Sequence, residues 1–298
     1  MINSLAPIAL FVYNRPGHTK KTVTALQKNK LAKDSKLFVF SDAPKNPAEK
    51  TEVKKVRNYL RQINGFKKIT IIEQKENQGL AKSIISGVTE IVNKYGRVIV
   101  LEDDLITSPY FLQYMNEALQ IYENDKQVMH ISGYFFPIKN NLPATFFFNQ
   151  TSCWGWSTWK RAWQYFNPDA NILLKEIKKG NQIKKFNLDG YHDFTKQLRD
   201  NINGNINTWA IKWQASVFLK DGLCLHPNKS LVQNIGHDGS GINCKENDIF
   251  NNDSLAGQIN ISPIVLKETV EARRLVAKFF AKRKMPLHKR LLLKIKSI

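Results

Sequence analysis

Short apolar runs alternate with amphipathic stretches over the first 104 residues, and this alternation restricts the possible folds more than any other feature. The apolar runs predict strands at residues 7–14, 36–42, 67–74 and 97–104. The stretches between them predict helices over residues 16–31, 47–63 and 79–95. Strands that are aliphatic throughout are typical of parallel sheets with helices on both faces. The expected fold class is therefore α/β, Rossmann-like, with a mostly parallel sheet.

The second part of the chain has a weaker pattern. It predicts helices over 110–124 and 207–222, strands at 128–135, 146–148 and 223–227, weak helices and loops over 171–206, and a glycine-containing loop over 231–244. Trp156, Trp159 and Trp163 stand at helical spacing, and such a stripe is more often part of a core than a platform for a ligand. We expect Trp159 and Trp163 to be buried in the core.

The charge of the chain favours an anionic partner. The sequence has 45 Lys and Arg against 25 Asp and Glu, a formal net charge of +20. Nucleic acid, an acidic membrane surface or a phosphorylated substrate could each balance such an excess. Residues 267–298 alone hold 11 Lys or Arg and two Glu, a net +9. They also carry two apolar stripes, Leu275, Val276, Phe279 and Phe280, then Leu287, Leu291, Leu292 and Ile295. This segment indicates either an anionic membrane surface as partner or a helix docked on the domain.

The three cysteines, Cys153, Cys224 and Cys244, are widely spaced and odd in number. They support neither a disulfide framework nor a zinc knuckle, so a reducing, cytoplasmic setting fits best. No run approaches the roughly 20 apolar residues of a membrane-spanning helix. We expect a soluble or peripheral protein.

Three consecutive acids, Glu102, Asp103 and Asp104, follow the fourth predicted strand. Adjacent carboxylates repel one another and become favourable around a cation. Hard ions such as Mg²⁺ or Mn²⁺ take oxygen ligands and can neutralise a diphosphate leaving group. Alternatively, the acids stabilise the first turn of the helix that follows. Because ligands bind at the carboxyl ends of strands in open α/β sheets, we expect these acids to converge with the polar residues that follow the other strands.

At this point a resemblance is visible. The segments VYNRP, FSDA, ENQGLAKSIISGV and VIVLEDDLITSPYFLQYMNEAL occur in the order and spacing of GT-A fold, nucleotide-sugar-dependent glycosyltransferases. The chain resembles the N-acetylglucosaminyltransferase I type and its bacterial relatives. WGWSTWKRAW and TWAIKW are similar to the branch that builds surface polysaccharides or lipo-oligosaccharides. The resemblance covers about residues 7–245. It implies a GT-A domain over 1–265, with a nucleotide-sugar-binding half (1–106) and an acceptor-side half (107–265), before a basic helical tail (266–298).

The resemblance also implies roles for individual residues. Asp104 would hold the metal, with Glu102 and Asp103 contacting the donor sugar and the ribose. Asn14 and Arg15 would lie by the nucleotide phosphates, and Asp42 would accept the N–H of the base. The nucleotide pocket would be lined by Asn77, Gly79 and Lys82. From the residues alone, Asp42 could instead form a turn before Pro44, and Gly79 could serve as a helix-entry glycine.

The acceptor side is less determined. Trp154 and Trp156 flank Gly155, and we expect both near the acceptor. His237 stands where many relatives bring a histidine to the metal or diphosphate, although bacterial relatives carry an aromatic residue there. The relatives' catalytic Asp is replaced by Ala210, so Asp238 is the nearest candidate base, unless the reaction retains configuration and needs no base from the protein.

These features predict a glycosyltransferase that depends on Mn²⁺ or Mg²⁺, uses a UDP-sugar and acts on a glycan or glycolipid acceptor at the inner face of the cytoplasmic membrane. An enzyme that makes the activated sugar is an alternative, but VYNRPGHTKK has one glycine and no phosphate loop. A nucleic-acid-binding protein is another alternative. No helix-turn-helix, zinc module or stacking aromatic pattern is visible, so we expect no nucleic acid partner.

Overall fold

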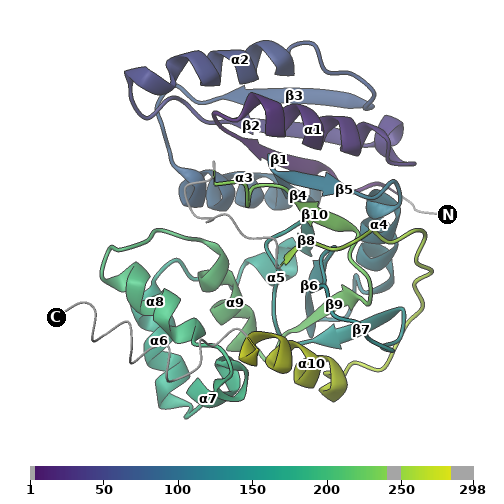
Figure 1. The fold of residues 1–298 in the computed structure, drawn as a ribbon, viewed down its shortest axis with the longest axis vertical. Helices are drawn as coiled ribbons and strands as arrows, with labels where there is room; N and C mark the ends of the chain where they lie inside the picture. Colours follow the sequence, from purple (N-terminus) through teal and green to yellow (C-terminus); the bar gives the residue numbers. More distant parts are fainter. Residues whose placement is uncertain (1–3, 240–249, 283–298) are drawn as a thin grey trace.

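The computed structural model describes residues 4–239 and 250–282. An eight-stranded sheet with the order β3-β2-β1-β4-β8-β6-β9-β7 runs through the molecule (Figure 1). Its first part consists of β1 (Ile8–Val12), β2 (Lys36–Ser41), β3 (Lys68–Glu73) and β4 (Arg97–Glu102), all paired in parallel. The four predicted strands and their parallel pairing are confirmed. β4 ends at Glu102, two residues earlier than expected, because Asp103 and Asp104 form a turn.

The second part of the sheet is mixed. It contains β8 (Trp156–Trp159), β6 (Val128–Ser132), β9 (Leu223–Pro227) and β7 (Thr145–Phe148). β8 pairs antiparallel with both β4 and β6, β9 pairs parallel with β6, and β7 pairs antiparallel with β9. The three tryptophans at helical spacing do not share one helix: Trp156 and Trp159 lie in a strand, and Trp163 lies in α5 (Lys160–Trp163).

Helices cover both faces of the parallel part. α1 (Pro16–Gln27), α2 (Lys50–Leu60) and α4 (Phe111–Ile121) lie on one face, and α3 (Leu80–Tyr95) lies on the other. Successive β1 residues point to opposite faces: Leu10 shares a core with Val23 of α1, and Phe11 shares one with Ile84 of α3. A Cβ atom on Gly87 would lie 2.8 Å from the Phe11 ring, so glycine lets α3 pack closely on the sheet. The α/β fold class is confirmed.

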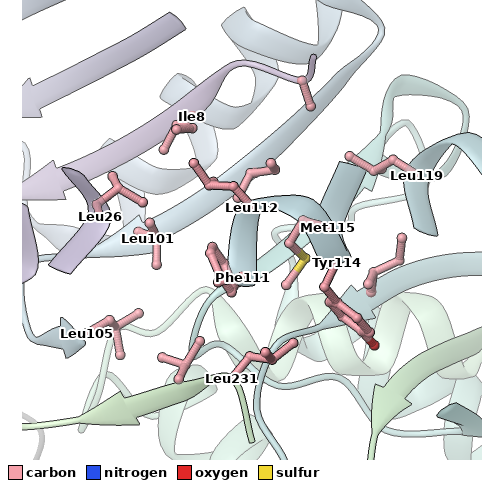
Figure 2. Close-up of a cluster of buried hydrophobic side chains, with 14 of the residues drawn as sticks. Ile8, Leu26, Leu101, Leu105, Phe111, Leu112, Tyr114, Met115, Leu119 and Leu231 are labelled. Carbon is pink, nitrogen blue, oxygen red and sulfur yellow. The ribbon is translucent and has the colours of Figure 1, made fainter. Parts of the chain in front are cut away.

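A two-stranded sheet next to the strand-end acids was not expected from the sequence. β5 (Leu105–Thr107) pairs antiparallel with β10 (Val232–Asn234), which lies inside the region predicted as a loop. Leu101 and Leu105 flank the three acids and are both fully buried. Figure 2 shows them in one apolar cluster with Leu26, Phe111 and Leu231. The core therefore anchors the acidic turn at both of its ends.

The remaining helices form a lobe beside β7 and β9 (Figure 1). They are α6 (Ala170–Lys179), α7 (Ile183–Phe186), α8 (Phe194–Ile202), α9 (Ala210–Phe218) and α10 (Val270–Ala281). Short 3₁₀ turns occur at η1 (Ala32–Asp34), η2 (Pro47–Glu49) and η3 (Leu188–Gly190). None of the helices within residues 4–239 and 250–282 is long and apolar enough to cross a membrane.

α10 is the described part of the predicted basic tail, and it packs on this lobe. Ala272 and Val276 are fully buried in the same core as Phe146 and Leu173. Arg273 adds an ion pair to Asp189 at 2.8 Å. For residues 270–281 the docked-helix alternative is therefore correct. The second predicted stripe, residues 287–295, lies outside the described residues.

Candidate active site

The carboxyl ends of β1 and β4 lie side by side, because Phe11 and Glu102 are register partners in the parallel pair. β1 leads directly to Arg15, and β4 leads directly to Asp103 and Asp104. Nη2 of Arg15 donates to Oδ2 of Asp104 at 2.8 Å and also to Oδ1 of Asp103. The convergence of polar residues expected at this edge is confirmed for these three side chains.

The turn that carries the acids is tied to α1 and to β1. The hydroxyl of Thr22 donates to the main-chain carbonyl of Asp103 at 2.8 Å and accepts from the N–H of Leu105 at 3.1 Å. The N–H of Tyr13 donates to Oδ2 of Asp103 at 3.3 Å. These bonds hold the turn in one conformation, so the carboxylates are presented by rigid backbone rather than by a loose loop.

Negative charge exceeds positive charge at this edge. Desolvation raises the pKa of Glu102 well above its ordinary value, and the neighbouring carboxylates of Asp104 and Asp103 raise it further, against the opposing effect of Arg15. Burial also raises the pKa of Asp103, and Arg15 counteracts that shift. Burial alone would lower the pKa of Arg15, but the two aspartates outweigh it and raise the pKa. Three carboxylates facing one guanidinium leave a formal excess of two negative charges.

Asp42 holds the loop between β3 and α3. Its Oδ1 accepts the N–H groups of Ala43 and Gln78 at 2.8 Å, and its Oδ2 accepts the N–H of Gly79 at 2.8 Å and Nδ2 of Asn77 at 3.2 Å. Gly79 enters α3 with φ of 73°, which favours glycine, so its helix-entry role is real. The structure thus brings together Asp42, Asn77 and Gly79. Recognition of the base by Asp42 stays a prediction.

Among the described residues, the side chains of Asn14 and Lys82 have no hydrogen bond or ion pair with the other residues predicted to bind the donor. Asn14 is half-buried directly before Arg15, at the end of β1. Lys82 is exposed on α3, where it lines a hollow of about 590 Å³ together with Ile85, Thr89 and Asn207. None of those three was among the predicted site residues, and the contact of Lys82 with the nucleotide stays a prediction.

The segment after β10 closes over the acids. The N–H of Ile235 donates to the carbonyl of Asp104 at 2.8 Å. The backbone of Gly236 then passes so near that a Cβ atom there would lie 2.3 Å from Oδ2 of Asp104. Asp238, the candidate base, follows at the same edge, with its Oδ2 3.1 Å from Nε2 of His18. Its side chain is 49% exposed, so an acceptor hydroxyl could reach it.

His237 packs between two aromatic rings. Trp154 meets its ring edge to face at 5.3 Å, and Phe250 stacks on it at 5.6 Å. Both ring nitrogens are buried and without a hydrogen-bond partner among the described residues. In residues 4–239 and 250–282, no three His, Cys, Asp or Glu side chains are grouped as a metal site. The role of His237 as a metal ligand stays a prediction.

The two tryptophans expected near the acceptor have different environments. Trp154 is half-buried and lines a pocket of about 300 Å³. Trp156 is fully buried and stacks on Trp209 at 5.1 Å and on His130 at 5.3 Å. The placement of Trp156 at the acceptor is therefore corrected: β8 is a central strand, and its side chains belong to the core. As expected, Trp159 and Trp163 are also buried.

Three further residues at or beside the site were missed by sequence reasoning. His18 pairs with Asp238, Gly236 lies against Asp104, and Gln150 lines the pocket beside Trp154. The glycine content of the segment 233–241 pointed to a close backbone approach, but not to its partner. Neither His18 nor Gln150 belongs to a motif, so no sequence signal could have identified them.

Comparisons with known proteins agree with this architecture. The family model described as Glycosyl transferase family 2 matches residues 8–205. No curated protein matches the chain.

Three solved structures illustrate how distant the similar folds are. TarS from S. aureus is 14% identical over 46% of this chain, with a TM-score of 0.30, and the match spans 23% of that protein. The mannosyltransferase PcManGT from Pyrobaculum calidifontis, in complex with GDP-Man and Mn²⁺, is 10% identical over 74% of this chain and 70% of its own, with a TM-score of 0.37. A UDP-glucose pyrophosphorylase complexed with UDP-glucose is 11% identical over 75% and 90%, with a TM-score of 0.36.

Proposed function

The chain belongs to glycosyl transferase family 2, and from that premise we propose that it moves a sugar from a UDP-sugar to a glycan or lipid-linked acceptor. As a glycosyltransferase of the GT-A fold, it is not the nucleotidyltransferase or the nucleic-acid-binding protein that the sequence left open. The observation that carries the proposal is the grouping of Arg15, Asp103 and Asp104 at the carboxyl ends of β1 and β4. Ligands of open α/β sheets bind at this edge.

The acids at this edge fit a hard divalent cation, Mn²⁺ or Mg²⁺. Among the described residues, none donates a hydrogen bond to the carboxyl of Glu102 or to Oδ1 of Asp104, so these oxygens are available. Oxygen donors with excess negative charge are what such ions select. Asp104 would hold the ion, with Glu102 beside it. A bound ion would supply positive charge to the diphosphate leaving group.

The chain's own residues would prepare the site for the donor. Arg15 orients Asp103 and Asp104 and offsets part of their repulsion. Asp42 holds the loop with Asn77 and Gly79 at the end of β2, where the base is proposed to bind. A displacement reaction gains when each group is held in its reactive position before the substrate arrives.

Asp238 is proposed as the base that takes the proton from the acceptor hydroxyl. His18 lies 3.1 Å from its carboxylate and would orient it. Ala210, which stands where relatives carry the catalytic Asp, lines the same pocket as Trp154, so this wall presents a methyl group rather than an acid. A reaction that retains configuration, with no base from the protein, is the second possibility.

We place this reaction at the inner face of the cytoplasmic membrane, in surface polysaccharide or lipo-oligosaccharide synthesis. On α6 and α7, Ile172 and Ile183 are exposed next to the exposed Lys175, Lys178 and Lys184. Apolar side chains among lysines are typical of contact with anionic lipid. This surface and the basic residues after 282 would together attach the enzyme.

The test of the function is nucleotide release from a panel of UDP-, GDP- and CMP-sugars, with Mn²⁺, with Mg²⁺ and with a chelator. We expect UDP to be released from one UDP-sugar in the presence of either ion and not with the chelator. Release that continues undiminished with the chelator would show that the reaction does not depend on a divalent metal ion. No binding of any of the nucleotide sugars would end the proposal.

A further inference from the structure

A pocket of about 300 Å³ opens beside Trp154, next to the candidate donor site. Seven Phe, Tyr or Trp side chains line it, among them Tyr134, Phe148, Trp154, Phe194, Phe250 and Phe280. Four of them lie between β6 and β8, a stretch that includes β7, and the others are Phe194 of α8, Phe250 and Phe280 of α10. Its volume lies at the lower end of the range for small-molecule sites, which suits one ring better than a chain.

Gln150 provides the polar feature of this pocket. The residue is 7% exposed, lines the pocket, and its Oε1 is buried with no hydrogen-bond partner in the described part of the chain. By contrast, the neighbouring Gln214 is engaged, since its Oε1 accepts the N–H of Thr151. A buried acceptor without a partner is unfavourable. A ligand that donates an O–H or N–H to Gln150 would remove this cost.

The pocket also selects by charge. Among the described residues that line it, none is Lys, Arg, Asp or Glu. A phosphate, a nucleotide or an acidic sugar would find no Lys or Arg there, only the imidazoles of His192 and His226. An alkyl chain would suit the aromatic walls but would leave Gln150 unpaired. A neutral pyranose meets both conditions, because its C–H face packs on aromatic rings while its hydroxyls can donate hydrogen bonds.

The pocket is joined to the donor site through two residues. Trp154 contacts the ring of His237, and the preceding Gly236 lies against Asp104. Part of the lining, including Phe250 and Phe280, lies beyond residue 205, where the match to the family ends. The pocket is thus completed by a part of this chain that the family does not define.

We propose that this pocket binds a neutral sugar ring of the acceptor, with Gln150 accepting a hydrogen bond from one of its hydroxyl or amide groups. The inference rests on the proposed function, because it assigns the ring to the acceptor rather than to the donor. α10 then serves as a wall of the acceptor site, through Phe280, in addition to its packing role.

The test is saturation-transfer NMR on the full chain, with methyl glycosides of neutral hexoses, deoxyhexoses and N-acetylhexosamines at millimolar concentration. We expect transfer to the ring protons of at least one of them, and we expect it to persist with saturating UDP and Mn²⁺. Gln150→Leu should weaken that sugar's binding about 3- to 10-fold, the effect of one lost hydrogen bond. Gln164→Leu, at an exposed glutamine outside the pocket, is the matched control and should bind as the wild type does.

Several results would overturn the inference. They are no transfer to any methyl glycoside, loss of transfer when UDP is added, or equal binding by a Gln150→Leu variant whose melting curve shows that it is folded. Transfer confined to the alkyl protons of octyl glucoside would assign the pocket to lipid instead. If Gln150→Leu does not fold, binding of the methyl glycosides to the wild type, measured with and without UDP, still tests the inference. UDP release by the wild type is measured separately. If UDP is released but no glycoside binds, this inference fails and the proposed function stands.

Discussion

Gly236 lies directly against Asp104: a Cβ atom at position 236 would be 2.3 Å from Oδ2 of the carboxylate and 3.0 Å from Nη1 of Arg15. The two residues are 132 positions apart in the sequence, and the β5–β10 pair brings them together. The strand-end acids are therefore covered by backbone that must lack a side chain.

Gly236→Ala should disturb the Arg15–Asp104 pair, because the methyl group cannot fit without moving one of them. Overpacking of this kind costs about 1–3 kcal/mol. If moving Arg15 or Asp104 weakens stabilisation of the transition state, the rate of UDP release should fall about 10-fold or more. Gly257→Ala is the control, because no atom lies within 4 Å of a Cβ built there. Equal rates for the two variants would show that the close approach has no functional role.

Asp104→Asn should reduce ion-dependent UDP release by at least about 100-fold, the scale of losing one preorganised charged group in an active site. The fold should persist, with a melting temperature equal to or above that of the wild type. The reason is that Asp104 is one of the two carboxylates that raise the pKa of Glu102. Asp34→Asn, at an exposed acid, should change neither quantity. A collapsed melting curve for Asp104→Asn would instead assign a structural role to this acid.

His226 should make the protein sensitive to mild acid. Burial lowers the pKa of its imidazole to about 4, although hydrogen bonds to the carbonyls of Gln150 and Tyr134 favour the charged form. The unfolded chain binds this proton below a pH of about 6.5 and the folded chain only near 4, so the free energy of unfolding falls as the pH decreases through this window. The shift corresponds to roughly 3 kcal/mol.

The measurement is urea unfolding of the wild type and of His226→Gln between these pH values. The variant should lose less stability on acidification than the wild type. A residual slope is expected in both proteins, because burial also lowers the pKa of His130. Parallel curves would mean that His226 does not contribute to the loss.

Two truncations separate the roles of the C-terminal segment. Removal of residues 283–298 should preserve the melting temperature and weaken sedimentation with vesicles that contain anionic lipid, since it removes six Lys or Arg. Removal from residue 270 onward should also destabilise the domain, because Ala272 and Val276 leave its core. Neutral vesicles are the control. Unchanged sedimentation of the shorter truncation would remove the membrane proposal for these residues.

The sequence by itself determines the parallel half of the sheet and the edge at which the site lies. The continuous aliphatic runs that became β1 to β4 have two faces to bury, so a parallel sheet between helices is the arrangement that satisfies them. Polar residues that directly follow such strands must lie at one edge, which is why Arg15 and the acids after β4 could be grouped in advance. Both inferences depend on residues close in sequence or on a repeating topology.

Tertiary structure decided the rest, because those contacts join segments with no common pattern. Trp154 and Trp156 are two residues apart, yet one lines a pocket and the other is core, since the sheet continues from β4 into β8. The approach of Gly236 to Asp104 requires β10 to pair with β5. The pocket around Gln150 requires α10 to dock on the helical lobe. The periodicity of apolar residues predicts which face of a helix or strand is buried. Which other element packs on that face depends on tertiary structure.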